Sequence, residues 1–186
     1  MTRIVGIAGS LRRQSFNLRL LRAAQDLMPE GAVLDIRTIE GVPLYNADVE
    51  SASGLPAAVV VLKEAIADAD GLLLATPEYN NGIPGVFKNA IDWLSRPPED
   101  IGRIFGGRPV AVIGASPGNF GTLLAQDAWL PVLRTLGARP WFEGRLMASR
   151  AATLFDERGA LVDEGTRKRL QGFLHGFAAF AGAQKG

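Results

Sequence analysis

The sequence contains no cysteine and only one histidine, His175. Without cysteine the chain has no thiol nucleophile, no disulfide and no thiolate ligand for zinc or an iron–sulfur cluster. A single imidazole also excludes a histidine-rich metal site, so we expect no metal centre. A Ser-His-Asp triad would need His175, which falls in an apolar helical pattern near the C-terminus. Any redox chemistry therefore requires an electron carrier that the chain binds.

Strong net charge and long hydrophobic runs are also missing. The 20 Lys and Arg residues nearly balance the 19 Asp and Glu residues, which leaves a net charge of +1. No basic block indicates a nucleic-acid partner. No apolar stretch reaches about 18 residues, and the N-terminal apolar run is too short for a signal peptide. We therefore expect no nucleic acid, no membrane and a cytoplasmic location.

Apolar runs typical of buried strands alternate along the chain with segments of helical spacing. The strands expected cover residues 4–8, 32–37, 71–75, 108–115 and 139–142, and the helices expected cover residues 17–28, 55–69, 84–95, 123–136 and a C-terminal stretch with Leu170, Phe173, Leu174, Phe177 and Phe180. A turn or small hairpin is expected around Arg158 and Gly159. The alternation predicts one α/β domain over residues 1–186, with a five-stranded parallel sheet between helices.

Three loops are rich in Gly, Ser, Asn and Pro, and each follows a buried strand. They cover residues 9–17, 76–85 and 114–122, after the first, third and fourth expected strands. In an open parallel sheet, ligands bind at the carboxyl ends of the strands, near the point where strand order reverses. We expect the three loops to converge there on one ligand.

The first loop, GSLRRQSFN, has the chemistry of an anion site. It is neither a Walker A loop nor a G-x-G-x-x-G turn, which disfavours a dinucleotide Rossmann site. Its hydroxyls, amide and guanidinium lead into an expected helix N-terminus, where backbone N–H groups and the helix dipole favour phosphate. The alternative is that Ser15 or Asn17 only caps the helix.

The second loop offers what a planar heterocycle needs, namely backbone donors and acceptors at its edge and a flat wall beside it, and the third loop can close over the same ring from the other side. Each has a plainer alternative. Tyr79 can be a half-buried packing residue, Lys88 is expected on a solvated helix face, and Trp93 is expected in the core. The third loop can be an ordinary strand-to-helix turn capped by Asn119 or Thr122.

These segments together resemble a known family. Residues 9–17 resemble the phosphate loop of the NAD(P)H-dependent FMN reductases, a group that includes bacterial quinone and chromate reductases and related azoreductases. Residues 77–80 (PEYN) and 88–95 (KNAIDWLS) are similar to its second signature, and residues 42–48 (VPLYNAD) to a loop after its second strand. At residues 81 and 82, where relatives often carry an aromatic and a small polar residue, this chain has Asn and Gly.

The resemblance implies a flavodoxin-like three-layer sandwich, with a parallel sheet of order 2-1-3-4-5 and helices on both faces. It implies noncovalently bound FMN, with NADPH or NADH as co-substrate. It also implies a homodimer or homotetramer with the site near the subunit interface. The FMN contacts that it implies are Ser10, Arg12, Ser15, Phe16 and Asn17 for the phosphate, Pro77, Glu78, Tyr79 and Asn80 for the ring, and Ser116 and Gly118 from the third loop.

The expected function is transfer of electrons from NAD(P)H through bound FMN to a quinone or a similar small acceptor. The cofactor supplies the reactive chemistry, so we name no catalytic side chain. Two alternatives stay open. One is a non-enzymatic flavodoxin-type carrier, although flavodoxins are usually strongly acidic and this chain is near neutral. The other is a regulatory protein that binds flavin without turnover, which no sequence feature excludes.

Overall fold

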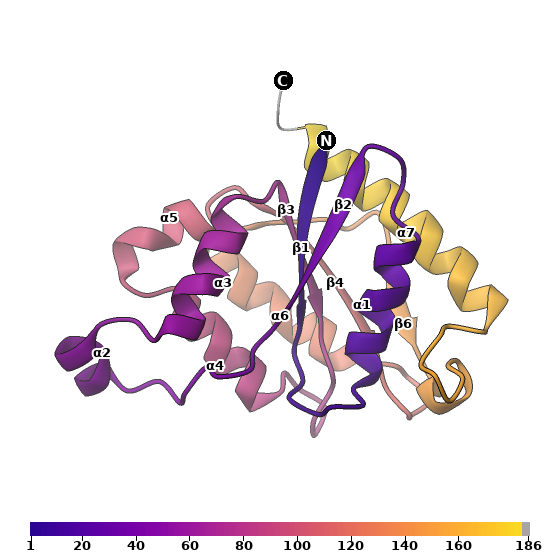
Figure 1. The fold of residues 1–186 in the computed structure, drawn as a ribbon, viewed down its shortest axis with the longest axis horizontal. Coiled ribbons are helices and arrows are strands. Elements are labelled where there is room, and N and C mark those ends of the chain that lie inside the picture. The colour runs from indigo at the N-terminus through magenta and orange to yellow at the C-terminus, as the bar shows by residue number, and fades with distance from the viewer. Residues whose placement is uncertain (184–186) are drawn as a thin grey trace.

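The computed structural model describes residues 1–183 as strands and helices in regular alternation (Figure 1). The strands are β1 (Thr2–Ala8), β2 (Ala32–Thr38), β3 (Gly71–Ala75), β4 (Pro109–Ala115), β5 (Arg139–Pro140) and β6 (Leu146–Ala148), and the helices are α1 (Phe16–Asp26), α2 (Ala47–Ser53), α3 (Ala57–Ala67), α4 (Gly85–Leu94), α5 (Ile101–Ile104), α6 (Leu123–Thr135) and α7 (Glu164–Gly182), with short 3-10 turns at Pro98–Asp100 and Ala151–Thr153. Among these helices none combines the length and the apolar character that crossing a membrane requires.

The sheet order is β2-β1-β3-β4-β5, and every strand pair in it is parallel. This confirms the expected order and the flavodoxin-like fold. The last sheet position differs from the expectation of one strand over residues 139–142. It is shared by β5, which pairs with the start of β4, and β6, which pairs with its end. The chain leaves the sheet between them, where the Trp141 ring packs edge-on against Phe173 of α7 at 4.9 Å.

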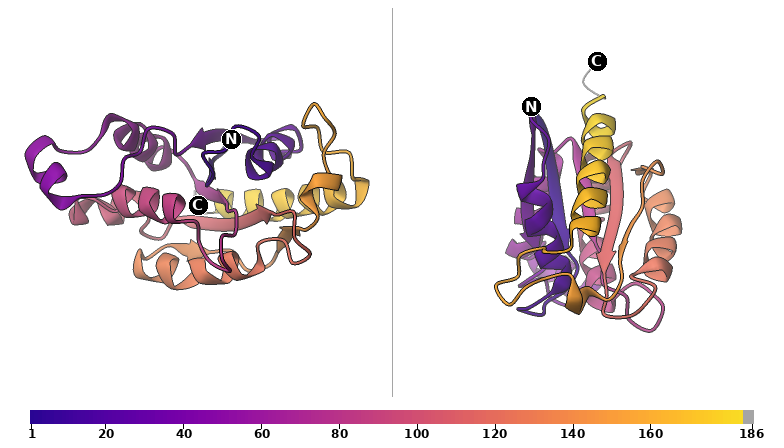
Figure 2. Two further views of the ribbon diagram at one scale, coloured as in Figure 1. Left: turned by 90° about the horizontal axis from the view of Figure 1, so that it is seen from below. Right: turned by 90° about the vertical axis from the view of Figure 1, so that its right-hand side faces the viewer.

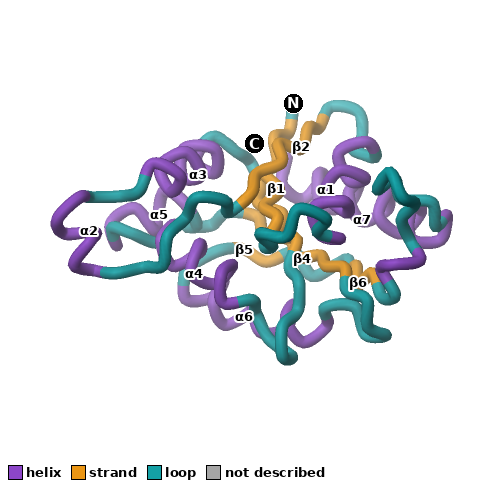
Figure 3. The backbone as a smooth tube through the Cα atoms, turned by 60° about the horizontal axis from the view of Figure 1, so that its bottom comes forward, coloured by secondary structure: helices purple, strands orange, loops and turns teal. Residues whose placement is uncertain are grey.

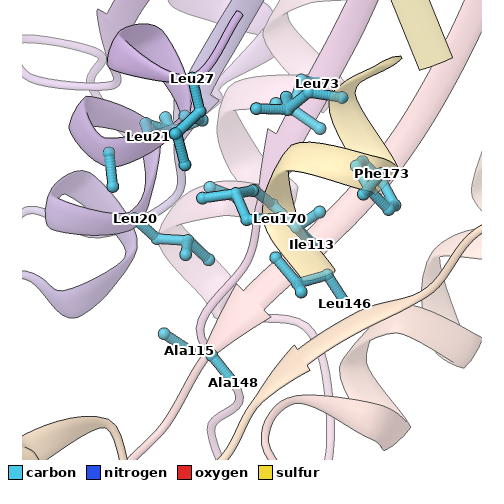
Figure 4. Close-up of a cluster of buried hydrophobic side chains, with 14 of the residues drawn as sticks. Leu20, Leu21, Leu27, Leu73, Ile113, Ala115, Leu146, Ala148, Leu170 and Phe173 are labelled. Atoms are coloured by element: carbon cyan, nitrogen blue, oxygen red, sulfur yellow. The ribbon is translucent and has the colours of Figure 1, made fainter. Parts of the chain in front are cut away.

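The two faces of the sheet carry separate hydrophobic clusters, because successive strand residues point to opposite sides. On one face, Ile4 and Ala8 of β1 pack with α1 and α7; on the other, Val5 and Ile7 pack with α3, α4 and α6. Figure 4 shows part of the first cluster, in which Leu21 of α1 and Leu170 of α7 lie over the sheet. The chain therefore forms the three layers that were expected.

Helix α2 and helix α5 were not expected from the sequence. α2 has no buried residue and projects from the body of the molecule (Figure 1, Figure 2). It shows no apolar stripe because none of its side chains is buried, and Glu50 joins it to the rest of the chain through an ion pair with Arg96. α5 is a four-residue helix with one buried side chain, Ile104. The turn expected near Gly159 is present, since Phe155 and Leu161 form an antiparallel bridge around it.

Candidate functional site

Three loops leave the carboxyl ends of β1, β3 and β4, which are neighbours in the sheet. Figure 3 brings that edge of the sheet forward, with the loops in teal. Strand order reverses here, since β1 leads to β2 on one side and β3 lies on its other side. This edge is therefore the place where an open parallel sheet binds its ligand.

The first loop ends in a capped helix N-terminus. The Ser15 hydroxyl oxygen accepts a hydrogen bond from the Leu18 N–H at 3.3 Å, which confirms Ser15 as the cap of α1. Upstream, the Ser10 hydroxyl accepts from the Arg12 N–H at 3.2 Å, and the exposed Arg12 side chain lies next to the turn. A helix leaves its first N–H groups without intrahelical partners, here those of Phe16 and Asn17. The loop thus gathers hydroxyls, a guanidinium and free N–H groups, a donor set that fits a phosphate.

The side chain of Asn17 forms hydrogen bonds that hold this loop to the end of β4. Its Nδ2 donates to the Ala115 carbonyl at 3.0 Å, and its Oδ1 accepts from the Ala115 N–H at 2.8 Å. Asn17 is only 3% exposed. Both amide atoms therefore connect α1 to the end of β4, and the backbone N–H remains as the group of Asn17 that can meet a phosphate.

The ring of Phe16 is also held by protein groups. It stacks on Phe155 with the ring centroids 6.1 Å apart. The guanidinium groups of Arg12 and Arg19 lie 5.9 Å and 5.8 Å from the ring centroid. The segment that carries Phe155 therefore supports the first loop, a contact between residues far apart in the sequence.

The first loop packs closely against α4, the helix that follows the second loop. A Cβ atom on Gly9 would lie 2.0 Å from Cδ1 of Phe87, a residue of α4 with 0% exposure. Only glycine allows this approach. The end of β1 and the start of α4 are thus in direct contact.

The second loop contains a tight hairpin. Tyr79 and Gly82 exchange two backbone hydrogen bonds, at 3.1 and 3.0 Å. The residues between them, Asn80 and Asn81, have φ values of 50° and 62°. Two-residue hairpin turns with both central φ positive favour Asn and Gly, which accounts for the two asparagines. The hairpin leaves the Tyr79 side chain 52% exposed.

Pro77 and Glu78, which precede the hairpin, contact protein groups. Pro77 is buried, and its carbonyl accepts from the Thr76 hydroxyl at 2.8 Å. A carboxylate oxygen of Glu78 accepts a hydrogen bond from the Ala125 N–H at the start of α6, at 2.9 Å. The second loop is therefore attached to the helix that follows the third loop.

The third loop is connected to β6, a strand that the sequence did not predict. The Ser116 N–H donates to the Ala148 carbonyl of β6 at 3.0 Å, and the Ser116 hydroxyl accepts from the Gly118 N–H at 3.1 Å. Arg150 donates its backbone N–H to Gly118 and its Nε to Asn119. Ser116 and Gly118 thus lie in one turn that residues 148–150 support.

The segment from Pro43 to Tyr45 is held by α4. Asn89 donates to the Pro43 carbonyl at 2.8 Å and accepts from the Tyr45 N–H at 2.8 Å, while the Trp93 indole donates to Pro43 at 2.9 Å. Trp93 is fully buried, as expected. The Lys88 side chain, expected on a solvated face, pairs with Asp92 one helical turn away at 2.7 Å. The two sequence motifs at residues 42–48 and 88–95 therefore contact each other.

An ionic contact attaches α2 to the end of α4. Arg96 Nε lies 3.0 Å from a carboxylate oxygen of Glu50, and the Tyr45 hydroxyl donates to the same oxygen at 3.0 Å. The hydrogen bond to Glu50 raises the pKa of the Tyr45 hydroxyl and also that of the Arg96 guanidinium. This cluster was not expected, because Arg96 lies 46 positions from Glu50 in the sequence.

Comparison with known proteins agrees with this geometry. A family model described as NADPH-dependent FMN reductase matches residues 2–153. An NAD(P)H-dependent FMN reductase from Pseudomonas aeruginosa is 46% identical over 169 residues, which cover 91% of this chain and 89% of that protein. A 2-hydroxy-1,4-benzoquinone reductase from a Burkholderia species is 41% identical over 178 residues, 96% of this chain and 95% of that protein.

The fold is also similar to that of a solved structure. The flavoenzyme NAD(P)H:(acceptor) oxidoreductase FerB from Paracoccus denitrificans superposes with a TM-score of 0.87 at 34% identity, over 98% of each chain. The similarity therefore extends through all three loops and beyond the sheet itself.

Proposed function

The chain belongs to the NADPH-dependent FMN reductase family, and we propose that it is an FMN-dependent oxidoreductase. It passes electrons from NADPH or NADH to quinones or similar small acceptors. The observation that carries the proposal is the meeting of three loops at the carboxyl ends of β1, β3 and β4. One of these loops has the donor set of a phosphate site. FMN, when bound, supplies the two-electron chemistry that no side chain of this cysteine-free chain provides.

We assign the phosphate to the first loop, where the N–H groups of Phe16 and Asn17 and the side chains of Ser10, Ser15 and Arg12 lie. The free N–H groups at the start of α1 supply donors, and the guanidinium supplies a positive charge. Asn17 contributes its backbone, because both its amide atoms bond to Ala115.

We assign the ring of FMN to the second and third loops. The hairpin that starts at Tyr79 and includes Asn80 forms one wall, supported from behind by Pro77 and Glu78. Ser116 and Gly118 approach from the third loop. The role of these residues is to bind and orient the cofactor and to keep an open face for the nicotinamide and the acceptor.

Quinone-like acceptors follow from the relatives, one of which is named a 2-hydroxy-1,4-benzoquinone reductase. We further propose that residues 1–186 act as one FMN-binding domain, in the cytoplasm, as a homodimer or homotetramer. Helix α2, which has no buried residue, supports self-association, because a seven-residue helix that buries no apolar face has little stability of its own.

The experiment is to purify the protein, add FMN, record the visible absorption spectrum, and measure NADH and NADPH oxidation with and without a quinone. We expect a bound-flavin spectrum and quinone-dependent oxidation. A colourless protein that takes up no FMN would refute the proposal. Flavin binding without NAD(P)H oxidation would favour a flavodoxin-type carrier or a regulatory protein.

A matched pair of variants tests the phosphate assignment. Arg12→Gln should weaken FMN binding by about tenfold, the usual order for one charged hydrogen bond. Its neighbour Arg13 is exposed and was not assigned to the phosphate. Arg13→Gln should therefore leave FMN affinity unchanged, and equal losses in the two variants would contradict the assignment.

A further inference from the structure

Glu78 occupies a position between two loops of the proposed flavin site. Its carboxylate accepts a hydrogen bond from the N–H of Ala125, 47 residues away, at 2.9 Å. Ala125 is the third residue of α6, and the preceding cap residue, Thr122, makes no side-chain capping bond of its own. A carboxylate at this place satisfies a free N–H and interacts favourably with the helix dipole. Glu78 therefore caps α6 from a different part of the chain.

The start of α6 is rigidly joined to the third loop. Thr122 is fully buried, and Gln126 donates its Nε2 both to the Thr122 hydroxyl at 3.1 Å and to the Leu146 carbonyl at 3.0 Å. Gly121 has a φ of 63°, and a Cβ there would lie 2.8 Å from Met147. The first turn of α6 and the third loop thus share one set of contacts and are positioned together.

On its other side, Glu78 is directly followed by the Tyr79–Gly82 hairpin. The two backbone hydrogen bonds of the hairpin join Tyr79 and Gly82 to each other. The bond from Ala125 to Glu78 is thus a direct link from the second loop to the helix behind the third loop.

We propose that Glu78 is a positioning residue: its carboxylate fixes the second loop against the third and so holds the two walls of the flavin site at the separation that FMN requires. This inference rests on the proposed function and deepens it. It assigns Glu78 to the connection between the loops rather than to contact with the flavin ring. A site that already has its bound geometry binds its ligand more tightly, because its loops lose less conformational entropy on binding.

The consequence is a loss of FMN affinity when the contact is removed. Glu78→Ala should raise the Kd for FMN by about tenfold, the order expected for one hydrogen bond to a charged group. Glu78→Gln keeps an oxygen that can accept from Ala125, so its Kd should stay within about threefold of the parent, with the small deficit due to the lost charge. At saturating FMN, Glu78→Ala should recover the parental kcat within about threefold, because no chemical step uses the carboxylate.

Asp163 provides a matched control. Its Oδ1 accepts from the Thr166 N–H at 2.7 Å and caps α7, a helix that none of the three loops precedes. Asp163→Ala removes the same kind of contact from the fold. It should lower the melting temperature of the apoprotein while leaving the Kd for FMN unchanged.

The experiment titrates the apoprotein with FMN, following the quenching of flavin fluorescence, for the parent, both Glu78 variants and Asp163→Ala. Melting temperatures are measured without FMN. A parent that binds no FMN overturns the proposed function itself. A parent that binds FMN while Glu78→Ala binds equally well overturns only the positioning role. That role is also overturned if Glu78→Gln binds as weakly as Glu78→Ala, if Asp163→Ala loses as much affinity, or if kcat at saturating FMN stays lower than the parental value by more than about threefold.

Discussion

Replacing Asn17 by alanine separates two roles for a residue that the family resemblance places on the phosphate. Its amide makes two hydrogen bonds to Ala115, at 3.0 and 2.8 Å, and is 3% exposed. The substitution leaves the N–H and C=O of a buried residue without these partners. An unpaired buried group costs about 1–3 kcal/mol, so the two together should lower the free energy of unfolding by about 2–6 kcal/mol. For a domain of this size, that corresponds to a melting temperature lower by about 4–24 °C.

The assay is thermal unfolding of the apoprotein, followed by circular dichroism, with no flavin present. Ser15→Ala is the control, because it removes the cap of the same helix without touching β4. Loss of an N-cap costs about 1 kcal/mol, so the control should melt only slightly below the parent. If Asn17→Ala melts with the parent and yet binds FMN poorly, the amide serves the ligand and the structural role is refuted. A control that melts as low as Asn17→Ala would refute the contribution of the Ala115 contact.

Two further substitutions test close packing and a helix cap. Gly9→Ala places a Cβ 2.0 Å from the buried Phe87 ring and should lower the free energy of unfolding by about 1–3 kcal/mol, as overpacking does. The midpoint of unfolding in urea measures this loss, and an unchanged midpoint would show that the ring moves aside freely. At Asp163, hydrogen bonds from the Thr166 hydroxyl and N–H lower the pKa of the carboxyl group, so its contribution to stability is present above the unfolded pKa and is lost as pH falls through the folded one. The difference in melting temperature between the parent and Asp163→Asn should therefore shrink below about pH 4, and a difference that stays constant with pH would contradict this.

The sequence predicted the central strands and the helix starts well, because both depend on neighbouring residues. β3 is a continuous apolar run over Gly71–Ala75, and all five of its residues are buried. Ser15 has the local chemistry of an N-cap and acts as one. α2 was not predicted because it has no buried residue and no apolar stripe. β6 escaped because three residues, Leu146–Ala148, carry too little pattern to mark a strand.

The site was predictable as a place but not as a set of contacts. Composition identified the three loops, and the rule for parallel sheets brought them to one edge. The contacts that hold the loops join residues far apart in the sequence, such as Asn17 with Ala115 and Glu78 with Ala125, which are 98 and 47 positions apart. No local pattern reports such a pairing, because it depends on how α1 and α6 pack against the sheet.

These contacts show that several side chains which the family resemblance places on the cofactor serve the protein's own structure. Asn17 and Glu78 direct their polar atoms to the backbone of another element, and the Phe16 ring stacks on Phe155. The groups left to face a cofactor in these loops are then mainly backbone N–H and C=O groups, whose positions depend on the side chains behind them. A substitution at these residues will therefore weaken FMN binding by displacing a loop and will also destabilise the apoprotein. The exposed Arg12 guanidinium makes a weaker contact, 5.9 Å from the centroid of the Phe16 ring, so at Arg12 affinity should fall while most of the apoprotein stability is kept.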